Sequence, residues 1–423
     1  MSIKSDLTVL KTNIQAAKDK LYTNLTEKGV TDITTASTLD AMADSVSGIT
    51  TGGGGNPFEA IGYTETPKYM QDAIDYSQTI YDNWDASITS CYAKFSDDTQ
   101  LVYSPMIDTS NVTIMEKMFS YCTNLQYVPS LNTSNVTNMC QMFVGCGSLI
   151  SITFGDKWDT SNVTDMGSMF SSCSGLTSLD LSSFDTSNVT NMWSMFRECK
   201  KLTSLDLSSF DTSNVTGMGY MFMNSSGLTS LDLSSFDTSN VTDMSDMFTS
   251  CSGLTSLDLS SFDTSKVTNM QSMFSYCGGL TSLDLSSFDT SNVTSMNGMF
   301  EKCNNLTRVD GYISFKSYSS STMNQYYIVG YSSNSTLRKI TFKDIGYHSN
   351  AKQFNMSYAT NWGVNSDTIT DARQSLIDSL ITYSFDRATN GYSTCTVTLS
   401  SKTKAVLTED EIAQITAKGF TIA

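Results

Sequence analysis

The chain has 423 residues, a formal net charge of −17 and only 16% charged residues. Nucleic-acid binding is not expected, because a phosphate backbone is bound by clustered Lys and Arg, which so acidic a chain does not supply. No stretch approaches the ~18 apolar residues of a membrane span, and the amino terminus lacks the apolar run of a secretory signal. We therefore expect no membrane insertion. We expect either a cytoplasmic protein or one that leaves the cell by another route, such as a virus particle.

Residues 1–49 are predicted to form a helical attachment module. Apolar residues recur there at alternating spacings of four and three, which is the seam of a short coiled coil: Ile3, Leu7, Leu10, Ile14, Ala17 and Leu21. Three heptads are marginal alone, so this helix either packs in a hairpin against a second helix around 39–46 or self-associates into a homo-oligomer, such as a trimer. Residues 50–57, TTGGGGNP, follow as a Gly-rich linker.

Residues 58–107 are predicted to be an amino-terminal cap with irregular first repeats. The segment TPKYMQDAIDYSQTIYDNW has the apolar spacing of an amphipathic helix, which we expect to cover the open end of the repeats that follow. A cap is expected because the end coil of a repeat array exposes apolar core and unpaired backbone.

Residues 108–305 contain a regular repeat, clearest in LTSLDLSSFDTSNVTNMWSMFRECKK, which is 176–201. Its Asp-Thr-Ser motif recurs every 26 residues from Asp159 to Asp289, and eight Met-Phe pairs mark the copies. A period of 20 to 30 residues with a Leu-x-x-Leu-x-Leu pattern predicts a leucine-rich-repeat solenoid, in which each coil buries its apolar side against its neighbours.

Within one unit the apolar period changes. Leu179 and Leu181 alternate with polar residues, which predicts a strand with one face inward. Val189, Met192, Phe196 and Cys199 follow helical spacing, so we expect a short helix in each coil, with Asp185 capping its start. The predicted fold class is an α/β repeat, a solenoid with a short strand and a short helix per coil. Residues 306–423 are predicted to hold decaying repeats and a carboxyl-terminal cap, with helices over 371–382 and within 408–423 and a last strand at the carboxyl terminus.

The repeat motif LTSLDLSxFDTSNVTxMxxMFxxC closely resembles the BspA-like leucine-rich repeats of bacterial surface proteins, over residues 108–305. The resemblance implies extracellular adhesion to proteins or host surfaces. The secretion signal and wall anchor usual in bacterial members are not evident, and residues 1–49 with their Gly linker resemble the amino-terminal segments of structural proteins in tailed bacteriophages. We therefore expect a virion fibre, on a phage head or tail, that docks on virion proteins through this module and binds a cell-surface glycan or protein through its solenoid. The alternative is a bacterial adhesin at the cell surface, and a carbohydrate-active enzyme is the third choice.

Seven of the ten cysteines occupy one repeat position: Cys122, Cys146, Cys173, Cys199, Cys251, Cys277 and Cys303. A disulfide ladder is disfavoured because neighbouring Cβ vectors run parallel, and a zinc site needs four converging ligands. We expect these cysteines, called the Cys column below, to be small core residues with weak thiol hydrogen bonds.

A second set of repeated residues is acidic and is predicted to line the exposed face of the strands. We call it the strand-face Asp column: Asp180, Asp206, Asp232, Asp258 and Asp284. Two interpretations stay open, a solvated acidic stripe or a ligand surface that binds with or without Ca²⁺; no other cofactor and no resident metal are expected. The turn Asp column is instead assigned to turn and cap chemistry: Asp185, Asp211, Asp237, Asp263 and Asp289. The Asn of the Asn-Val-Thr motif is assigned to capping as well.

Comparison of the copies shows that substitution concentrates at the positions of Trp193, Ser194, Arg197 and Glu198, which we expect on an outer helical face. The single histidine, His348, lies in a polar context without a nucleophile motif, and no catalytic signature stands out. We therefore expect a non-enzymatic protein with no catalytic residues.

Overall fold

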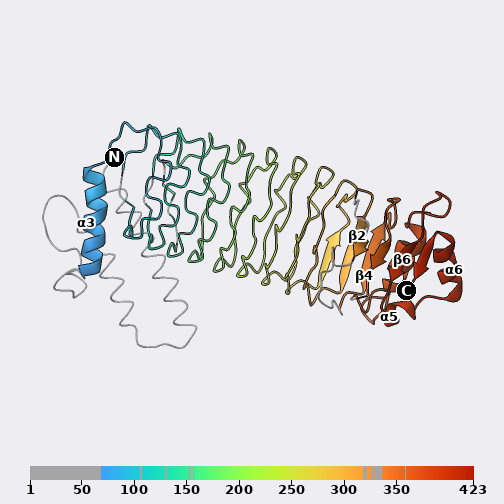
Figure 1. The fold of residues 1–423 in the computed structure, drawn as a ribbon. Coiled ribbons are helices and arrows are strands. Elements are labelled where there is room, and N and C mark those ends of the chain that lie inside the picture. Colours follow the sequence, from blue (N-terminus) through green and yellow to red (C-terminus); the bar gives the residue numbers. More distant parts are fainter. Residues whose placement is uncertain are drawn as a thin grey trace, which may run out of the picture.

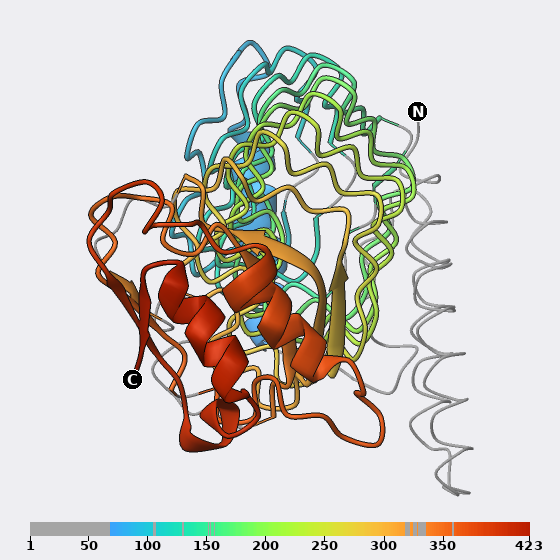
Figure 2. The same ribbon diagram turned by 90° about the vertical axis from the view of Figure 1, so that its right-hand side faces the viewer.

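The computed structural model describes residues 68–423, except 105–106, 129–130, 151, 153, 156, 318–321, 325–327, 329–335 and 358. The described chain is an elongated stack of coils (Figure 1). Helix α3 (Lys68–Asp82) lies at one end and a small region of helices and strands lies at the other. Seen from the carboxyl-terminal end, successive coils follow nearly the same outline (Figure 2). The predicted helical module at 1–49 and the linker at 50–57 lie outside the described residues.

Parallel backbone pairing joins each coil to the next, as expected for a repeat array. Single parallel bridges connect equivalent residues along the whole stack, in the order Ser90, Ile114, Asn138, Asp165, Asn191, Gly217, Asp243, Asn269 and Ser295. Each bridge joins positions one repeat apart, so every coil has neighbours on both sides. The apolar side of a coil is therefore covered by the coils above and below it.

The predicted helix in each coil is wrong. In 192–199 the backbone forms consecutive turns, in which the Met195 amide donates to the Met192 carbonyl at 3.2 Å while the Ser194 amide donates to the Gly219 carbonyl of the next coil at 2.9 Å. Alternate amides thus bond within the coil and between coils. This pattern needs left-handed residues, and Ser194 has a φ of 57°.

The spacing of the coils explains why turns replace helices. Stacked phenylalanine rings from neighbouring coils have centroids 5.5–5.9 Å apart, whereas packed helix axes need about 8–10 Å. A helix would also satisfy its own amides and leave none for the next coil. The apolar spacing of three and four residues is real, but it arises from turns of three residues.

Among the described residues, the predicted strand of the repeat is present at the carboxyl-terminal end of the repeats. There β1 (Ser282–Leu285), β2 (Arg308–Ser314) and β4 (Lys339–Lys343) form a parallel sheet in that order. In the earlier described coils the Leu-x-Leu segment has the predicted alternation, with Leu179 and Leu181 buried and Asp180 exposed, but it does not form a continuous strand ladder. The alternation of buried and exposed side chains in this segment was predicted correctly, whereas its pairing into a continuous sheet was not.

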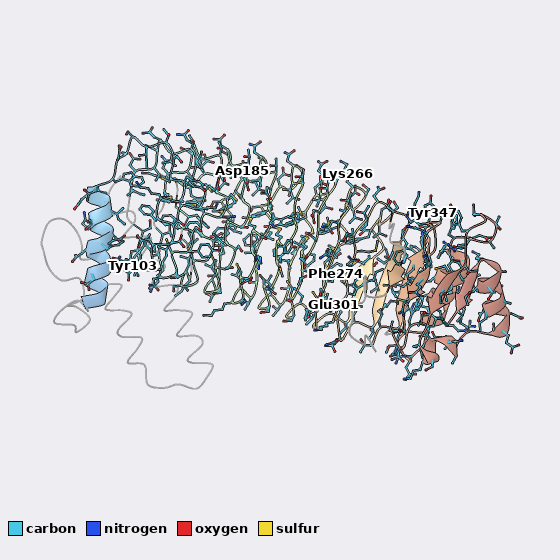
Figure 3. The ribbon with its side chains drawn as sticks, viewed as in Figure 1. Tyr103, Asp185, Lys266, Phe274, Glu301 and Tyr347 are labelled. Carbon is cyan, nitrogen blue, oxygen red and sulfur yellow. The ribbon has the colours of Figure 1, made fainter. Side chains whose placement is uncertain are left out.

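The core consists of columns of identical side chains. Nine phenylalanines form one continuous stack through the described coils: Phe95, Phe119, Phe143, Phe170, Phe196, Phe222, Phe248, Phe274 and Phe300. The offset between rings suits aromatic pairs, which prefer centroid distances of about 4.5–7 Å. Figure 3 labels Phe274 within the rod and Asp185 and Lys266 along one edge.

The Cys column is buried, and its cysteines are free. Each Sγ donates to the carbonyl of the column phenylalanine in the preceding coil, at 2.9–3.2 Å. Ser225 occupies the same position in one coil, and its Oγ donates to the Phe196 carbonyl at 2.7 Å. The prediction of core residues with thiol hydrogen bonds is confirmed.

Both ends of the stack are covered. At the amino-terminal end the predicted amphipathic helix is present as α3, where Tyr76 Oη donates to Asp98 at 2.6 Å. At the other end β3 (Thr322–Asn324), β5 (Gln353–Asn355), β6 (Cys395–Thr398) and β7 (Phe420–Ile422) form a second parallel sheet in that order. The helices there are α4 (Ala372–Ile377), the π-helical turn η3 (Asp378–Thr382), α5 (Ser401–Lys404) and α6 (Glu409–Ala417). The helix predicted over 371–382 is confirmed as α4 and η3, and the last predicted helix and strand as α6 and β7.

Among the described residues, none of the helices is long and apolar enough to cross a membrane.

Candidate ligand-binding site

The strand-face Asp column is exposed, and it builds turns. Asp180 accepts a hydrogen bond from the Ser182 amide at 3.0 Å and from the Ser182 hydroxyl at 2.7 Å. The other four aspartates accept from the amide two residues later at 2.9–3.0 Å. These bonds lower the pKa of the Asp180 and Asp232 carboxyls, so the carboxylates stay ionised. The column therefore forms an acidic stripe that also fixes a corner in each of its five coils.

The strand-face Asp column does not gather into a cation site. Its members stand one per coil, and in the part of the chain that the structure describes no three His, Cys, Asp or Glu side chains are placed to hold a metal ion. Whether the stripe binds a ligand stays a prediction.

The turn Asp column combines turn chemistry with bonds between coils. The Ser187 amide donates to Asp185 at 3.0 Å, as the predicted turn role requires, but the expected helix cap is wrong because no helix follows. The buried Thr186 hydroxyl donates to the Asp211 carbonyl and accepts from the Asp211 amide, both at 2.9 Å. The side-chain amide of Asn188 likewise donates, through Nδ2, to the Ser161 carbonyl of the preceding coil at 2.8 Å. These side chains join coils and do not cap helices.

The variable positions do not form one outer face, contrary to the prediction. Trp193 is exposed, and its ring lies 4.8 Å from Tyr220 in the next coil. Gly219 makes room for this ring, since a Cβ there would lie 2.5 Å from it. Ser245 and Asp246, at equivalent positions, are buried. Left-handed turns direct some variable side chains inward and others outward.

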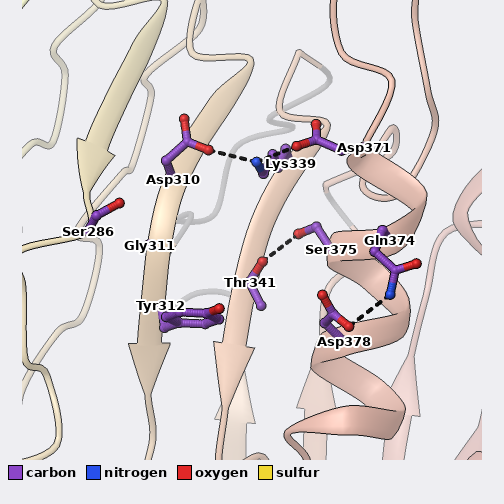
Figure 4. A pocket seen from close by; sticks show the side chains of 10 residues that line it. All are labelled: Ser286, Asp310, Gly311, Tyr312, Lys339, Thr341, Asp371, Gln374, Ser375 and Asp378. Atoms are coloured by element: carbon purple, nitrogen blue, oxygen red, sulfur yellow. Dashed lines mark hydrogen bonds and ion pairs between the residues drawn. The ribbon is translucent and has the colours of Figure 1, made fainter.

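A cavity of about 270 Å³ lies at the end of the strand-face Asp column, between the first sheet and α4 (Figure 4). Asp310 on β2 pairs in register with Asp284 on β1, so it continues the column by one position. Two residues later Tyr312 extends over the sheet, and Gln374 on α4 lies across from it (Figure 4). The cavity is lined by Ser286, Asp310, Gly311, Tyr312, Lys339, Thr341, Asp371, Gln374, Ser375 and Asp378.

Ion pairs occupy the upper part of the cavity as drawn in Figure 4. Lys339 Nζ lies 2.7 Å from Asp310 and 2.6 Å from Asp371, and Arg308 Nε lies 2.5 Å from Asp310. Burial raises the pKa of Asp310, but hydrogen bonds from Arg308 and Lys339 outweigh burial and hold it below its usual value. The four side chains are therefore charged and neutralise one another.

Tyr312 is held in place by two contacts. Lys343 Nζ lies 3.7 Å from the ring centroid, and the Tyr383 ring packs edge-on with centroids 5.2 Å apart. The Tyr312 side chain nevertheless stays 41% exposed. The arrangement offers an immobilised aromatic surface beside hydrogen-bonding groups.

Sequence reasoning missed this cavity, although one signal pointed to it. Where the repeat LTSLDLSSF changes to LTRVDGYISF, a Ser of the exposed face becomes Tyr312 and another becomes Arg308. The loss of repeat identity at exposed positions marks a change of surface chemistry. The contribution of α4 had no such signal, because Asp371 and Gln374 lie far away in the sequence.

The remaining candidates show no catalytic arrangement. His348 packs edge-on against Tyr347, and its backbone carbonyl accepts a hydrogen bond from Arg387 at 2.8 Å. A second cavity of about 420 Å³ crosses four coils beside Glu198, Asn224 and Tyr276. Both lie on the surface of the rod or at its end.

Comparison with known proteins places the repeats in a family. The model of the family described as "Mycoplasma protein of unknown function, DUF285" matches residues 87–151, 148–252 and 227–340, which together exceed half of the chain. No curated protein matches this chain. Among solved structures, a leucine rich cell surface protein from Faecalibacterium prausnitzii A2-165 is 15% identical, with a TM-score of 0.26, over 66% of this chain and 84% of that chain.

Proposed function

The chain belongs to the family described as Mycoplasma proteins of unknown function, DUF285, and we propose that it is a non-catalytic adhesin of the bacterial cell surface. In this proposal the solenoid binds a glycan or a protein through its repeated exterior. The family match falls on the segment whose sequence resembles BspA-like repeats, which supports the adhesin interpretation over the others.

One observation carries the proposal: the rod presents the same exposed groups at five successive coils along an acidic, hydroxyl-rich stripe. Such an array offers many equivalent weak contacts in a line, and a partner with its own repeating units gains from engaging several together. Enzymes instead concentrate their chemistry in one enclosed site. The chemistry of the strand-face Asp column suits hydroxyl and amide donors.

The proposal is tested by binding of the labelled full chain to glycan arrays and to whole cells, with calcium and with a chelator. We expect binding, and we expect the double variant Asp232→Asn and Asp258→Asn to weaken it. The matched control is Asp237→Asn with Asp263→Asn, which removes the same charge from the turn Asp column. Absence of binding to every glycan, cell and matrix protein tested would contradict the adhesin role. Equal binding by both double variants would show that the strand-face Asp column takes no specific part in that role.

The virion-fibre hypothesis is the second candidate, and residues 1–49 alone support it. Their resemblance to phage structural proteins lies outside the described residues, and the family match begins only at residue 87. Under this hypothesis the same solenoid binds the host surface while the amino-terminal module docks on the virion. Mass spectrometry of purified phage particles decides it, since a fibre must be present in the particle.

A further inference from the structure

We propose that the cavity between β2, β4 and α4 binds one neutral sugar residue, which stacks on Tyr312 and donates hydrogen bonds to the surrounding carboxylates. The inference deepens the proposed adhesin function and rests on it. It assigns the sugar specificity to the carboxyl-terminal end of the rod.

The shape of the cavity favours a small ligand held at an end. Its floor is the β1–β2–β4 sheet, and α4 forms a wall beside it (Figure 4). Ser286 belongs to the coil of Asp284, so the cavity opens toward the strand-face Asp column. A volume of about 270 Å³ is at the small end of ligand pockets, which suits a single ring.

The charges of the cavity favour a neutral ligand. Arg308 and Lys339 are paired with Asp310 and Asp371 at 2.5–3.5 Å. An anionic ligand would have to displace these carboxylates from their cations. A cationic ligand would have to displace the cations as well, unless it paired with Asp378, which accepts a hydrogen bond from Gln374. A neutral hydroxyl can instead donate to a remaining carboxylate lone pair without breaking a pair.

The remaining lining groups match the hydroxyls of a sugar. Thr341 and Ser375 share a hydrogen bond between their hydroxyls at 2.8 Å, and Gln374 Nε2 donates to Asp378 at 2.9 Å. These groups include both donors and acceptors, as alternating sugar hydroxyls require. Tyr312 supplies the apolar element, because the C–H face of a pyranose packs on an aromatic ring.

The immobilised ring reduces the cost of binding. Lys343 and Tyr383 already fix Tyr312, so little side-chain entropy is lost when a ligand packs on it. The ion pairs hold Asp310 and Asp371 in the same way. A preformed site of this kind can bind one ring weakly, and repeated contacts along the stripe would strengthen the binding of a longer chain.

The experiment is saturation-transfer NMR on the full chain with methyl glycosides of glucose, galactose, mannose and N-acetylglucosamine, each at about 10 mM. Glucuronate and glucosamine serve as the anionic and cationic comparisons. We expect at least one neutral glycoside to bind, and its Kd to rise roughly tenfold or more in Tyr312→Ala. Tyr312→Phe keeps the ring and should bind within about threefold of the parent chain.

Two further variants keep the test decisive. Gln374→Ala alters an exposed residue on the opposite wall and should weaken binding even if Tyr312→Ala proves unstable. Tyr276→Ala removes an exposed tyrosine from the second cavity and should leave glycoside binding unchanged. Preference for a charged sugar, or absence of binding by every neutral glycoside, would overturn the inference. Binding by both Tyr312→Ala and Gln374→Ala that equals binding by the parent chain would also overturn it.

Failure of the inference is distinguishable from failure of the adhesin role. If whole cells bind the Tyr312→Ala chain as well as the parent chain while no glycoside binds, the adhesin role stands and the sugar cavity does not. If neither cells nor glycans bind the parent chain, the proposed function itself fails.

Discussion

At the residue scale, the fold is stabilised by small polar groups that satisfy the backbone between coils. The Thr186 hydroxyl and the Cys199 thiol are fully buried, and each bonds to a main-chain carbonyl of a neighbouring coil. Buried backbone groups that lack partners are costly, so these side chains complete hydrogen bonding where the coil geometry cannot. Their uniformity along the chain follows from this role.

The Thr186 hydroxyl should therefore contribute measurably to stability. Thr186→Val keeps the shape but leaves the amide and carbonyl of Asp211 without this partner, and we expect a loss of about 1–3 kcal/mol in the free energy of unfolding. Thr186→Ser retains the hydroxyl and should recover most of the loss. Urea unfolding measures both variants. Equal stability of the Val variant and the parent chain would mean that water or a shifted backbone replaces the bond.

The Cys column predicts a loss of stability in alkali. Burial raises the pKa of the Cys199, Cys251 and Cys303 thiols from 9.0 to about 12. The folded state thus favours the neutral thiol: its contribution is complete below pH 9 and is lost as the pH rises from 9 toward 12. At pH 10 each such thiol costs about 1.4 kcal/mol relative to neutral pH.

Serine substitution provides the control for this pH dependence. Ser225 shows that a hydroxyl makes the same bond, so Cys199→Ser with Cys251→Ser should fold and should lose less stability between pH 8 and pH 10 than the parent chain. Thermal melts at both pH values measure the difference. Identical pH dependence in the parent and the variant would assign the alkaline loss to other groups.

At the element scale, the sequence predicts which residues are buried better than how the backbone arranges them. The columns of Leu, Met, Phe and Cys follow from the 26-residue period, because identical positions stack when coils repeat. The segment 192–199 was predicted as a helix because turns of three residues also bury every third or fourth side chain. Ser194 and Glu198 have φ values of 57° and 59°, and neither residue type signals a left-handed turn.

The cavity shows a related limit at the same scale. The register of β1 and β2 could be aligned from the repeat, which places Asp310 and Tyr312 beside the strand-face Asp column. The wall from α4 could not, since Asp371 and Gln374 reach the sheet through a connection without repeat symmetry. The site arises where the repeat ends, and a periodic pattern carries no information there.

Close contact between the corners of adjacent coils gives a prediction for two neighbouring glycines. A Cβ on Gly279 would lie 2.3 Å from the Leu254 carbonyl oxygen and 2.7 Å from that of Ser252, whereas a Cβ on Gly278 meets nothing within 4 Å. Gly279→Ala should therefore cost about 1–3 kcal/mol, and Gly278→Ala should be nearly neutral. Lys201 occupies the equivalent position in another coil, so we expect a shifted backbone and not a failure to fold.

Chemical denaturation of the two alanine variants tests this difference in corner packing. Because the residues are adjacent, they share the same exposure to denatured-state effects and form a matched pair. A similar loss in both variants, or none in either, would contradict the close stacking of corners.

At the scale of the whole molecule, the rod has two different ends and a uniform middle. Helix α3 covers the first coil, and the second sheet with its helices covers the last (Figure 1). In such an array each coil contacts only its neighbours, so length can change without altering the ends. The proposed sugar cavity lies at one end and should be independent of the number of coils, whereas the acidic stripe grows with it.

Removal of one whole repeat tests this modular construction. Deletion of residues 237–262 joins Phe236 to Asp263 and restores the Phe-Asp-Thr-Ser sequence, so every column continues in register across the junction. We expect a folded chain whose rod is shorter by about 5 Å, the spacing of paired backbone segments, with an unchanged cavity at its carboxyl-terminal end. Deletion of only 237–249 is the control, because it removes half a coil and places polar corner residues in the core columns. Small-angle scattering measures the length, and thermal melting compares the two deletions. If both deletions unfold alike, stability depends on contacts between distant coils, and the description of the chain as a stack of nearest-neighbour units is wrong.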